Sequence, residues 1–181
     1  MTKALLVIDI QNDYFPGGKM ELVGAVEAAQ NAARVQRHFR EDRLPVFHIQ
    51  HIALSPTASF FLPDTYGVEI NLAVIPVGDE TVITKHFPNA FRETTLQNVL
   101  SELAVTDLTV VGMMTHMCVD TTVRAASDAG FKVTLIGDAC ATKNLEFGGV
   151  EVSAADVQTA YLAAIDGSFA TVISTDELLG N

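Results

Sequence analysis

The stretch LTVVGMMTHMCVDTTVRAASDAGFKVTLIG, residues 108–137, holds the pattern that decides the fold. Two apolar runs, residues 108–113 and 132–137, flank an Ala- and Val-rich segment over 117–129 that stops at Gly130. Short continuous apolar runs are typical of buried parallel strands, and a glycine after a helical segment is typical of a helix C-cap. The stretch therefore predicts a strand, a helix and a second strand parallel to the first.

The same alternation continues along the chain. Four further apolar runs predict strands, over residues 4–10, 45–52, 81–85 and 169–174. Apolar side chains spaced by three and four, together with helix-favouring composition, predict helices over residues 21–42, 93–103 and 150–164. Strands that alternate with helices form right-handed crossovers and a parallel sheet covered on both faces. We therefore expect one domain, residues 1–181, with a three-layer α/β/α fold around a mostly parallel, six-stranded, Rossmann-like sheet.

Residues 53–80 break this alternation. They contain three prolines and two glycines, at Pro56, Pro63, Gly67, Pro76 and Gly78. These are too many helix breakers for a long helix. We expect an excursion over one end of the sheet that serves as a lid or as an interface arm.

Composition limits the classes of partner. Eleven basic residues against 22 acidic ones give a formal net charge of −11, which excludes nucleic acid and anionic membranes as partners because both need a basic surface. No apolar run approaches the roughly 20 residues that span a bilayer, and the N-terminus carries no leader pattern. With 49% hydrophobic residues and two cysteines, we expect a reduced cytoplasmic protein that forms a homo-oligomer, a dimer or larger.

Three reactive side chains fall at predicted strand ends, where ligands bind in open α/β sheets. Asp9 lies near the end of the first strand, Lys85 ends the third, and Cys118 follows the fourth at the start of a helix. Alone, each has an ordinary alternative: a turn cap, an exposed lysine, a packing thiol. Together they form a proton-transfer apparatus, in which Lys85 and the helix amides favour the thiolate and Asp9 acts as general base.

Three blocks of the chain carry a family resemblance: LLVIDIQNDYFPGG, TKHFPNAF and VVGMMTHMCVDTTVRAASDAGFKVTLIGDACA. In order and motif they resemble the isochorismatase-like cysteine hydrolase superfamily, from residue 4 to about residue 142. The resemblance implies a catalytic triad of Asp9, Lys85 and Cys118. It also implies a cis peptide between Met113 and Met114, and an oxyanion hole formed by the amides of Met114 and Cys118.

No metal site is expected. His48 and His51 form an HxxH pair, but residues three apart on a strand point to opposite faces. The nicotinamidase branch of the superfamily uses an Asp and histidines after the second strand, whereas Gln50 stands at the Asp position here. The sequence thus predicts neither metal nor cofactor.

Four residues are expected to line a small-molecule pocket. Tyr14 and Phe91 match pocket positions of the superfamily, Asn89 offers a polar contact, and His51 lies at a strand end. The second cysteine, Cys140, is expected to be structural, because a loop-like segment rather than a helix follows it. The remaining histidines, His38, His86 and His116, are expected at the surface or at an interface.

The resulting functional expectation is a hydrolase that cleaves a small amide, ureido or related C–N bond through a Cys118 thioester. Nicotinamidase-type or isochorismatase-type hydrolysis is the alternative within the superfamily. A redox-sensing thiol protein or an inactive oligomeric scaffold is the alternative of another class.

Overall fold

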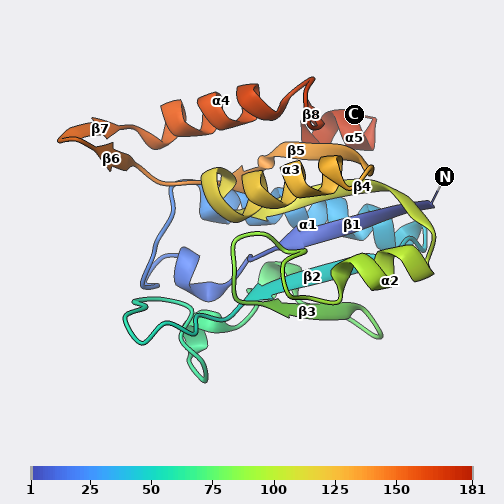
Figure 1. The fold of residues 1–181 in the computed structure, drawn as a ribbon, viewed down its shortest axis with the longest axis horizontal. Helices are drawn as coiled ribbons and strands as arrows, with labels where there is room; N and C mark the ends of the chain where they lie inside the picture. The colour runs from blue at the N-terminus through green and yellow to red at the C-terminus, as the bar shows by residue number, and fades with distance from the viewer. Residues whose placement is uncertain (1, 181) are drawn as a thin grey trace.

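A computed structural model describes residues 2–180, and its centre is one six-stranded parallel sheet in the order β3-β2-β1-β4-β5-β8 (Figure 1). All five strand pairings in this sheet are parallel. The strands are β1 Thr2–Ile8, β2 Val46–His51, β3 Thr81–Lys85, β4 Val105–Met113, β5 Lys132–Ala141 and β8 Thr171–Ile173. The expected α/β sheet is confirmed.

Helices cover both faces of the sheet. They are α1 Ala25–Glu41, α2 Leu96–Glu102, α3 Asp120–Asp128, α4 Ala154–Ile165 and α5 Thr175–Leu179. The apolar stripe of α1 packs with Leu5 and Val7 of β1 in one core cluster, to which α5 adds Leu178. The second cluster joins α2, α3 and α4 to the opposite face of the sheet. This gives the three layers that the alternating pattern predicts.

The central strand β1 explains why the first apolar run has no polar alternation. Residues 4–8 are at most 1% exposed, because both faces of β1 are covered. On one side β1 meets β4, where Gly112 lies opposite Ile8. A Cβ at Gly112 would come within 2.2 Å of the Ile8 carbonyl oxygen, so only glycine permits this approach.

The segment 53–80 is the expected excursion, with only short 3₁₀ turns at Tyr66–Val68 (η2) and Leu72–Val74 (η3). Buried polar side chains directly after β1 hold it. Asn12 Nδ2 donates to the Tyr66 carbonyl at 3.1 Å, and Asp13 Oδ2 accepts from the Phe61 amide at 2.6 Å. A Cβ at Gly67 would collide with the Asp13 carboxylate. The excursion is therefore a packed cap on the sheet.

Several boundaries differ from the sequence predictions, and the largest differences lie in the C-terminal third. Val150 belongs to a hairpin of β6 Leu145–Phe147 and β7 Val150–Val152, which projects from the body of the molecule (Figure 1), and not to α4. The spacing of Val150 from the helix residues that follow matches a helix by coincidence. Gly148 and Gly149, both with positive φ, form a hairpin turn just before Val150, so the chain is still in the hairpin there. The short α5, capped by Ser174, was not predicted.

Cys140 lies inside β5 and not after it, which corrects the predicted end of this strand at residue 137. The register of β4 and β5 shifts after Val110, so that Gly112 pairs with Cys140. Such an irregularity leaves no periodic signal in the sequence of one strand. Among residues 2–180, no helix is long and apolar enough to cross a membrane.

Candidate active site

The reactive side chains converge where the strand order reverses. From β1 the chain proceeds to β2 and β3 on one side of the sheet, and then to β4 on the other side of β1. The crevice at such a switch point, outside the carboxyl ends of the strands, is the usual ligand site of doubly wound sheets. Asp9 follows β1, Lys85 ends β3, and Cys118 lies in the turn after β4.

The local backbone presents each group at this edge. Asp9 adopts a positive φ of 50°, which ends the extended path of β1. After β4, the Met113–Met114 peptide bond is cis, at the position that the resemblance implies. A π-helical turn over Thr115–Val119 (η4) then leads into α3 and carries Cys118.

Asp9, Lys85 and Cys118 are in contact and almost wholly buried. The ammonium of Lys85 lies 2.7 Å from Oδ2 of Asp9 and 3.3 Å from Sγ of Cys118. Asp9 and Lys85 are 0% exposed and Cys118 is 6% exposed. Among the described residues, the Lys85 ammonium is the polar partner of the Asp9 carboxylate, which therefore keeps acceptor capacity towards the thiol. The structure thus brings together the three residues that the sequence singled out.

The charges of the trio are set by burial and by one another. Burial alone would lower the pKa of Lys85, but the charges of Asp9 and Cys118 outweigh it and the pKa is raised. Burial, with the charge of Asp9, raises the pKa of the Cys118 thiol, and Lys85 offsets this only in part. The resting thiol is therefore neutral, in contrast to the thiolate favoured from the sequence, and needs a base to become a nucleophile.

Two backbone amides belong to the turn that carries the sulfur, those of Met114 and Cys118. In the turn after β4, the amides of Met117 and Val119 donate to the Met114 carbonyl, at 3.0 and 3.3 Å. Outside helices and strands, no backbone hydrogen bond within residues 2–180 is donated by the amide of Met114, and the amide of Cys118 lies in the same turn, directly beside its sulfur.

His51 is the fourth side chain of the site. Its Nδ1 lies 2.8 Å from the Lys85 ammonium, and its ring packs on Phe61 with 5.9 Å between ring centroids. Burial first, and then the charge of Lys85, lowers the pKa of His51 to about 4. His51 is consequently neutral at physiological pH.

The same groups do not form a convincing cation site. Asp9, His51 and Cys118 each offer a ligand atom, and these three atoms lie within 4.8 Å of one another. However, the ammonium of Lys85 contacts all three residues, so a positive charge already occupies the space among them. Gln50, at the acidic position of the nicotinamidase motif, instead donates to the Val68 carbonyl at 2.9 Å. The residues present do not fit a metal ion.

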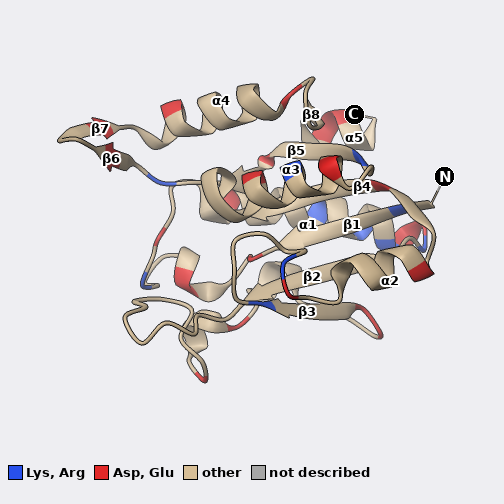
Figure 2. Cartoon of the chain, viewed as in Figure 1, with Lys and Arg blue, Asp and Glu red and all other residues tan. Residues whose placement is uncertain are grey.

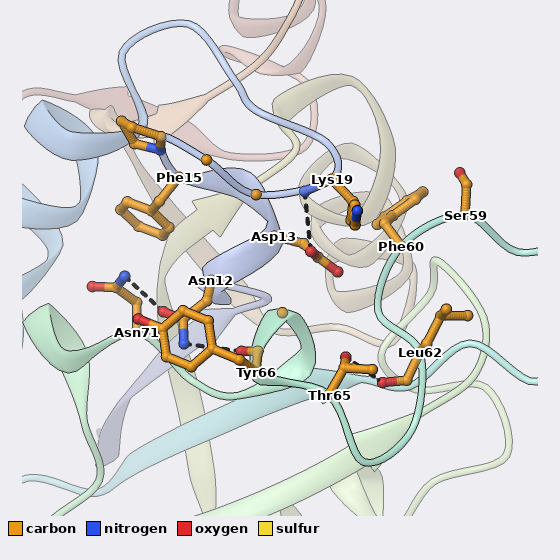
Figure 3. A pocket seen from close by; sticks show the side chains of 14 residues that line it. Asn12, Asp13, Phe15, Lys19, Ser59, Phe60, Leu62, Thr65, Tyr66 and Asn71 are labelled. Atoms are coloured by element: carbon orange, nitrogen blue, oxygen red, sulfur yellow. Dashed lines mark hydrogen bonds between the residues drawn. The ribbon is translucent and has the colours of Figure 1, made fainter.

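A chain of aromatic rings leads from His51 to a cavity lined by the segments after β1 and in the excursion. Tyr14 is buried, and its ring lies 6.0 Å from that of Phe60 and 4.7 Å from that of Phe61. Phe60 lines a cavity of about 360 Å³ between residues 12–19 and 59–71 (Figure 3). Asp9, Lys85 and Cys118 do not line this cavity.

The two other predicted pocket residues are placed differently. Asn89 Oδ1 accepts from the Phe91 amide at 2.9 Å and so stabilises its own turn. Phe91 stacks on Phe131, with 6.0 Å between ring centroids, and packs against the core cluster that also contains Cys118. The resemblance identifies Phe91 by its position in the sequence, but the direction of its loop follows from packing in the folded chain.

Gln11 is a site residue that sequence reasoning missed. Its side chain donates to the carbonyl and accepts from the amide of His51, both at 2.8 Å, and also donates to the Val68 carbonyl at 2.8 Å. It thereby joins the end of β1 to the end of β2 and to the excursion. A run of three polar residues, 11–13, directly after a buried strand was the available signal.

The remaining predicted residues have structural surroundings. The Cys140 thiol is buried and donates to the Ile136 carbonyl at 3.4 Å. His116 is half-buried beside Thr142, and its ring lies 6.0 Å from that of Tyr161 on α4. His38 and His86 are partly or fully exposed. Three of the 11 Lys and Arg residues lie on α1, and the others are scattered along the chain among acidic residues (Figure 2).

Comparison with known proteins places this site in a family. Residues 3–177 match the model of the isochorismatase domain. The chain is 51% identical over 179 residues to the uncharacterized isochorismatase family protein YddQ of Bacillus subtilis, with 99% of each chain covered. It is 32% identical over 155 residues to nicotinamidase 3 of Arabidopsis thaliana, covering 79% of this chain and 75% of the relative.

A solved structure agrees in fold over nearly the same extent. The crystal structure of an isochorismatase from Pseudomonas putida superposes with a TM-score of 0.90 and 36% identity. The match covers 97% of this chain and 89% of that chain. With the family model spanning almost the whole sequence, the chain belongs to the isochorismatase family and is an isochorismatase-family hydrolase.

Proposed function

We propose that the protein hydrolyses a small amide, ureido or related C–N bond through a thioester on Cys118. One observation carries the proposal: a buried ammonium, Lys85, contacts both a carboxylate and a thiol at the switch point of the sheet. One positive charge there balances one negative charge, whether the proton of the Asp9–Cys118 pair resides on sulfur or on oxygen. Proton transfer within the pair then needs no net change in buried charge.

Acylation begins with this transfer. Asp9 takes the thiol proton, and Sγ of Cys118 attacks the carbonyl carbon of the substrate. The amides of Met114 and Cys118 serve as the oxyanion hole for the negative oxygen of the tetrahedral intermediate. The C–N bond breaks when Asp9 returns the proton to the leaving nitrogen, which departs as ammonia or an amine and leaves a thioester.

Deacylation uses the same groups in reverse. Asp9 removes a proton from a water molecule, whose oxygen attacks the thioester carbonyl carbon. The C–S bond breaks, the sulfur recovers the proton from Asp9, and a carboxylic or carbamic acid is released. Lys85 remains an ammonium throughout and stabilises whichever partner is the anion.

The surroundings of the trio favour a small, partly apolar substrate. Phe61 packs on the ring of His51 and Tyr14 packs on Phe61, and the cavity of about 360 Å³ beyond them is not lined by Cys118. The family relative named nicotinamidase 3 supports C–N bond cleavage. Isochorismatase-type ether cleavage is the alternative within the family, but it leaves the contact between Lys85 and a thiol without a purpose.

A redox-sensing thiol is the alternative of another class. Sensor cysteines are accessible and have a low pKa. Cys118 is buried and its pKa is raised, which argues against that role. An inactive scaffold is disfavoured because all three members of the trio are present and in contact.

The test is release of ammonia or amine from a panel of small primary amides, ureido acids and aromatic carboxamides. We expect one class to turn over, with mass spectrometry detecting an acyl adduct on Cys118 during rapid quenching. A vinyl ether added to the panel covers the isochorismatase alternative. Turnover that persists in Cys118→Ala, or an adduct on another residue, would contradict the thioester.

We further propose that the protein is a cytoplasmic homo-oligomer, a dimer or larger, acting on a small molecule. Both cysteines are free, which fits a reducing compartment. The β6–β7 hairpin exposes Phe147 and Val150 to 91% and 65%, and the excursion exposes Leu72 to 77%. Burying such side chains against a second copy would be favourable. Light scattering should return at least twice the 19.4 kDa of one chain, and a value near that mass would contradict the assembly.

A further inference from the structure

We propose that His51 is a positioning residue: its Nδ1 accepts the third proton of Lys85 and holds the ammonium between Asp9 and Cys118. This inference rests on the proposed hydrolase function but concerns a side chain outside the Asp–Lys–Cys trio. His51 was expected from the sequence only as a residue that lines the pocket.

The Lys85 ammonium needs three hydrogen-bond acceptors. A lysine ammonium has three protons and no acceptor capacity, and a buried ammonium is costly unless each proton is used. Asp9 and Cys118 provide two acceptors, at 2.7 and 3.3 Å, and His51 Nδ1 provides the third at 2.8 Å. Without His51, one proton of a fully buried charge would lack a protein acceptor among the described residues.

Strand register places His51 beside the Lys85 ammonium. His51 and Lys85 are paired directly in β2 and β3. Paired residues of adjacent strands point to the same face, so the imidazole lies beside the lysine stem. Gln11 then fixes the backbone of His51 through two hydrogen bonds of 2.8 Å, which leaves the ring little freedom to withdraw.

The contact with Lys85 also fixes the tautomer of the His51 imidazole. Because Lys85 donates, Nδ1 must be the unprotonated nitrogen of His51, and the ring proton resides on Nε2. The groups that face the ring are Lys85 of β3, Asp9 after β1, Cys118 and His86, and burial together with Lys85 keeps the imidazole neutral. A neutral acceptor steadies the ammonium without adding a second charge to the site.

The consequence concerns proton transfer from Cys118 to Asp9. As the negative charge passes from the carboxylate to the sulfur, the ammonium must strengthen one contact and weaken the other. The hydrogen bond between Lys85 and His51 stays the same during this transfer. His51 therefore holds the ammonium in place while its other two contacts change, and loss of His51 weakens stabilisation of the thiolate.

The decisive experiment measures alkylation of Cys118 by iodoacetamide from pH 5 to 10, with mass spectrometry of the intact full-length protein. In His51→Leu, we expect the rate at neutral pH to fall by about tenfold, equivalent to a rise of about one unit in the thiol pKa. In His51→Asn, whose side-chain oxygen can replace Nδ1 as acceptor, the rate should return to within about threefold of the wild type. The control His86→Asn, at an exposed neighbouring histidine, should react like the wild type.

Equal losses in His51→Leu and His51→Asn would mean that ring shape, and not the acceptor, matters, and would overturn the proposal. So would an unchanged rate in His51→Leu, or a similar loss in His86→Asn. Should His51→Leu fail to fold, ¹⁵N NMR of the wild-type imidazole decides, because a proton on Nδ1 at neutral pH excludes the proposed role. Alkylation needs no substrate, so a dependence on His51 without any amide turnover would leave this inference intact while the proposed hydrolysis fails.

Discussion

Cys118 and Cys140 are the two cysteines of the chain, and they resemble each other in nearly every simple respect. Both are free, both are about 6% exposed, and they lie near the carboxyl ends of neighbouring strands. Burial raises the thiol pKa of both, that of Cys140 to about 12. The difference is the partner: Cys118 contacts the Lys85 ammonium, whereas Cys140 donates to the Ile136 carbonyl.

This comparison shows that neither burial nor a shifted pKa identifies a nucleophile. A thiol becomes useful when a base can take its proton and a fixed charge can stabilise the product. Cys118 has both in Asp9 and Lys85. Cys140 has a carbonyl acceptor, which stabilises the protonated thiol and offers no route to the anion.

Replacing each cysteine by serine breaks the comparison most directly. We expect Cys118→Ser to lower turnover by roughly 10⁴ or more, because an alcohol is far harder to deprotonate than a thiol. We expect Cys140→Ser to retain turnover within about threefold, since its hydroxyl can donate to the same carbonyl. Steady-state kinetics on the substrate found in the panel measures both, and comparable losses would refute the distinction.

The next largest effect is expected for the base. Asp9→Asn keeps the shape of the side chain but removes proton acceptance, so turnover should fall by roughly 10²–10⁴ with substrate binding largely retained. Kinetics measures the change in kcat, and calorimetry of a slowly hydrolysed substrate measures binding. Full activity in Asp9→Asn would require another base for Cys118.

Alkylation compares the two thiols without a substrate. Iodoacetamide at neutral pH should label Cys118 at least about tenfold faster than Cys140, because only the Cys118 thiolate is stabilised by a neighbouring ammonium. Lys85→Ala should remove most of this difference, since it withdraws the stabilising charge. Peptide mapping after timed quenching gives both rates, and equal labelling in the wild type would count against Cys118.

The smallest expected effect is on stability against pH. The pKa of His51 is lowered to about 4 in the fold, so the unfolded chain binds a proton that the folded chain does not. The free energy of unfolding should therefore decrease as pH falls from about 6.5 towards 4. Urea denaturation at pH 7 and pH 4.5 should show a smaller decrease in His51→Asn than in the wild type. Identical decreases in the two proteins would mean that burial and Lys85 do not lower the pKa of His51.

The residues of the site that could be predicted from the sequence are those at the ends of strands. Continuous apolar runs mark β1, β3 and β4, and the carboxyl ends of parallel strands meet at one edge of the sheet. Asp9, Lys85 and Cys118 could thus be grouped before any coordinates were known. Phe91 illustrates the limit, because the direction of the loop after β3 depends on packing against α3 and Phe131.

The sequence by itself determined the parallel α/β sheet, the excursion over residues 53–80 and the three reactive residues, because periodicity and residue type are local properties. Only the tertiary structure decided that the Cys118 thiol is neutral at rest, that His51 contacts Lys85, and that Cys140 lies within β5. Those features depend on burial and on register between strands that are distant in the sequence. Desolvation and contact geometry arise only when the sheet is assembled, which is why residue spacing alone cannot supply them.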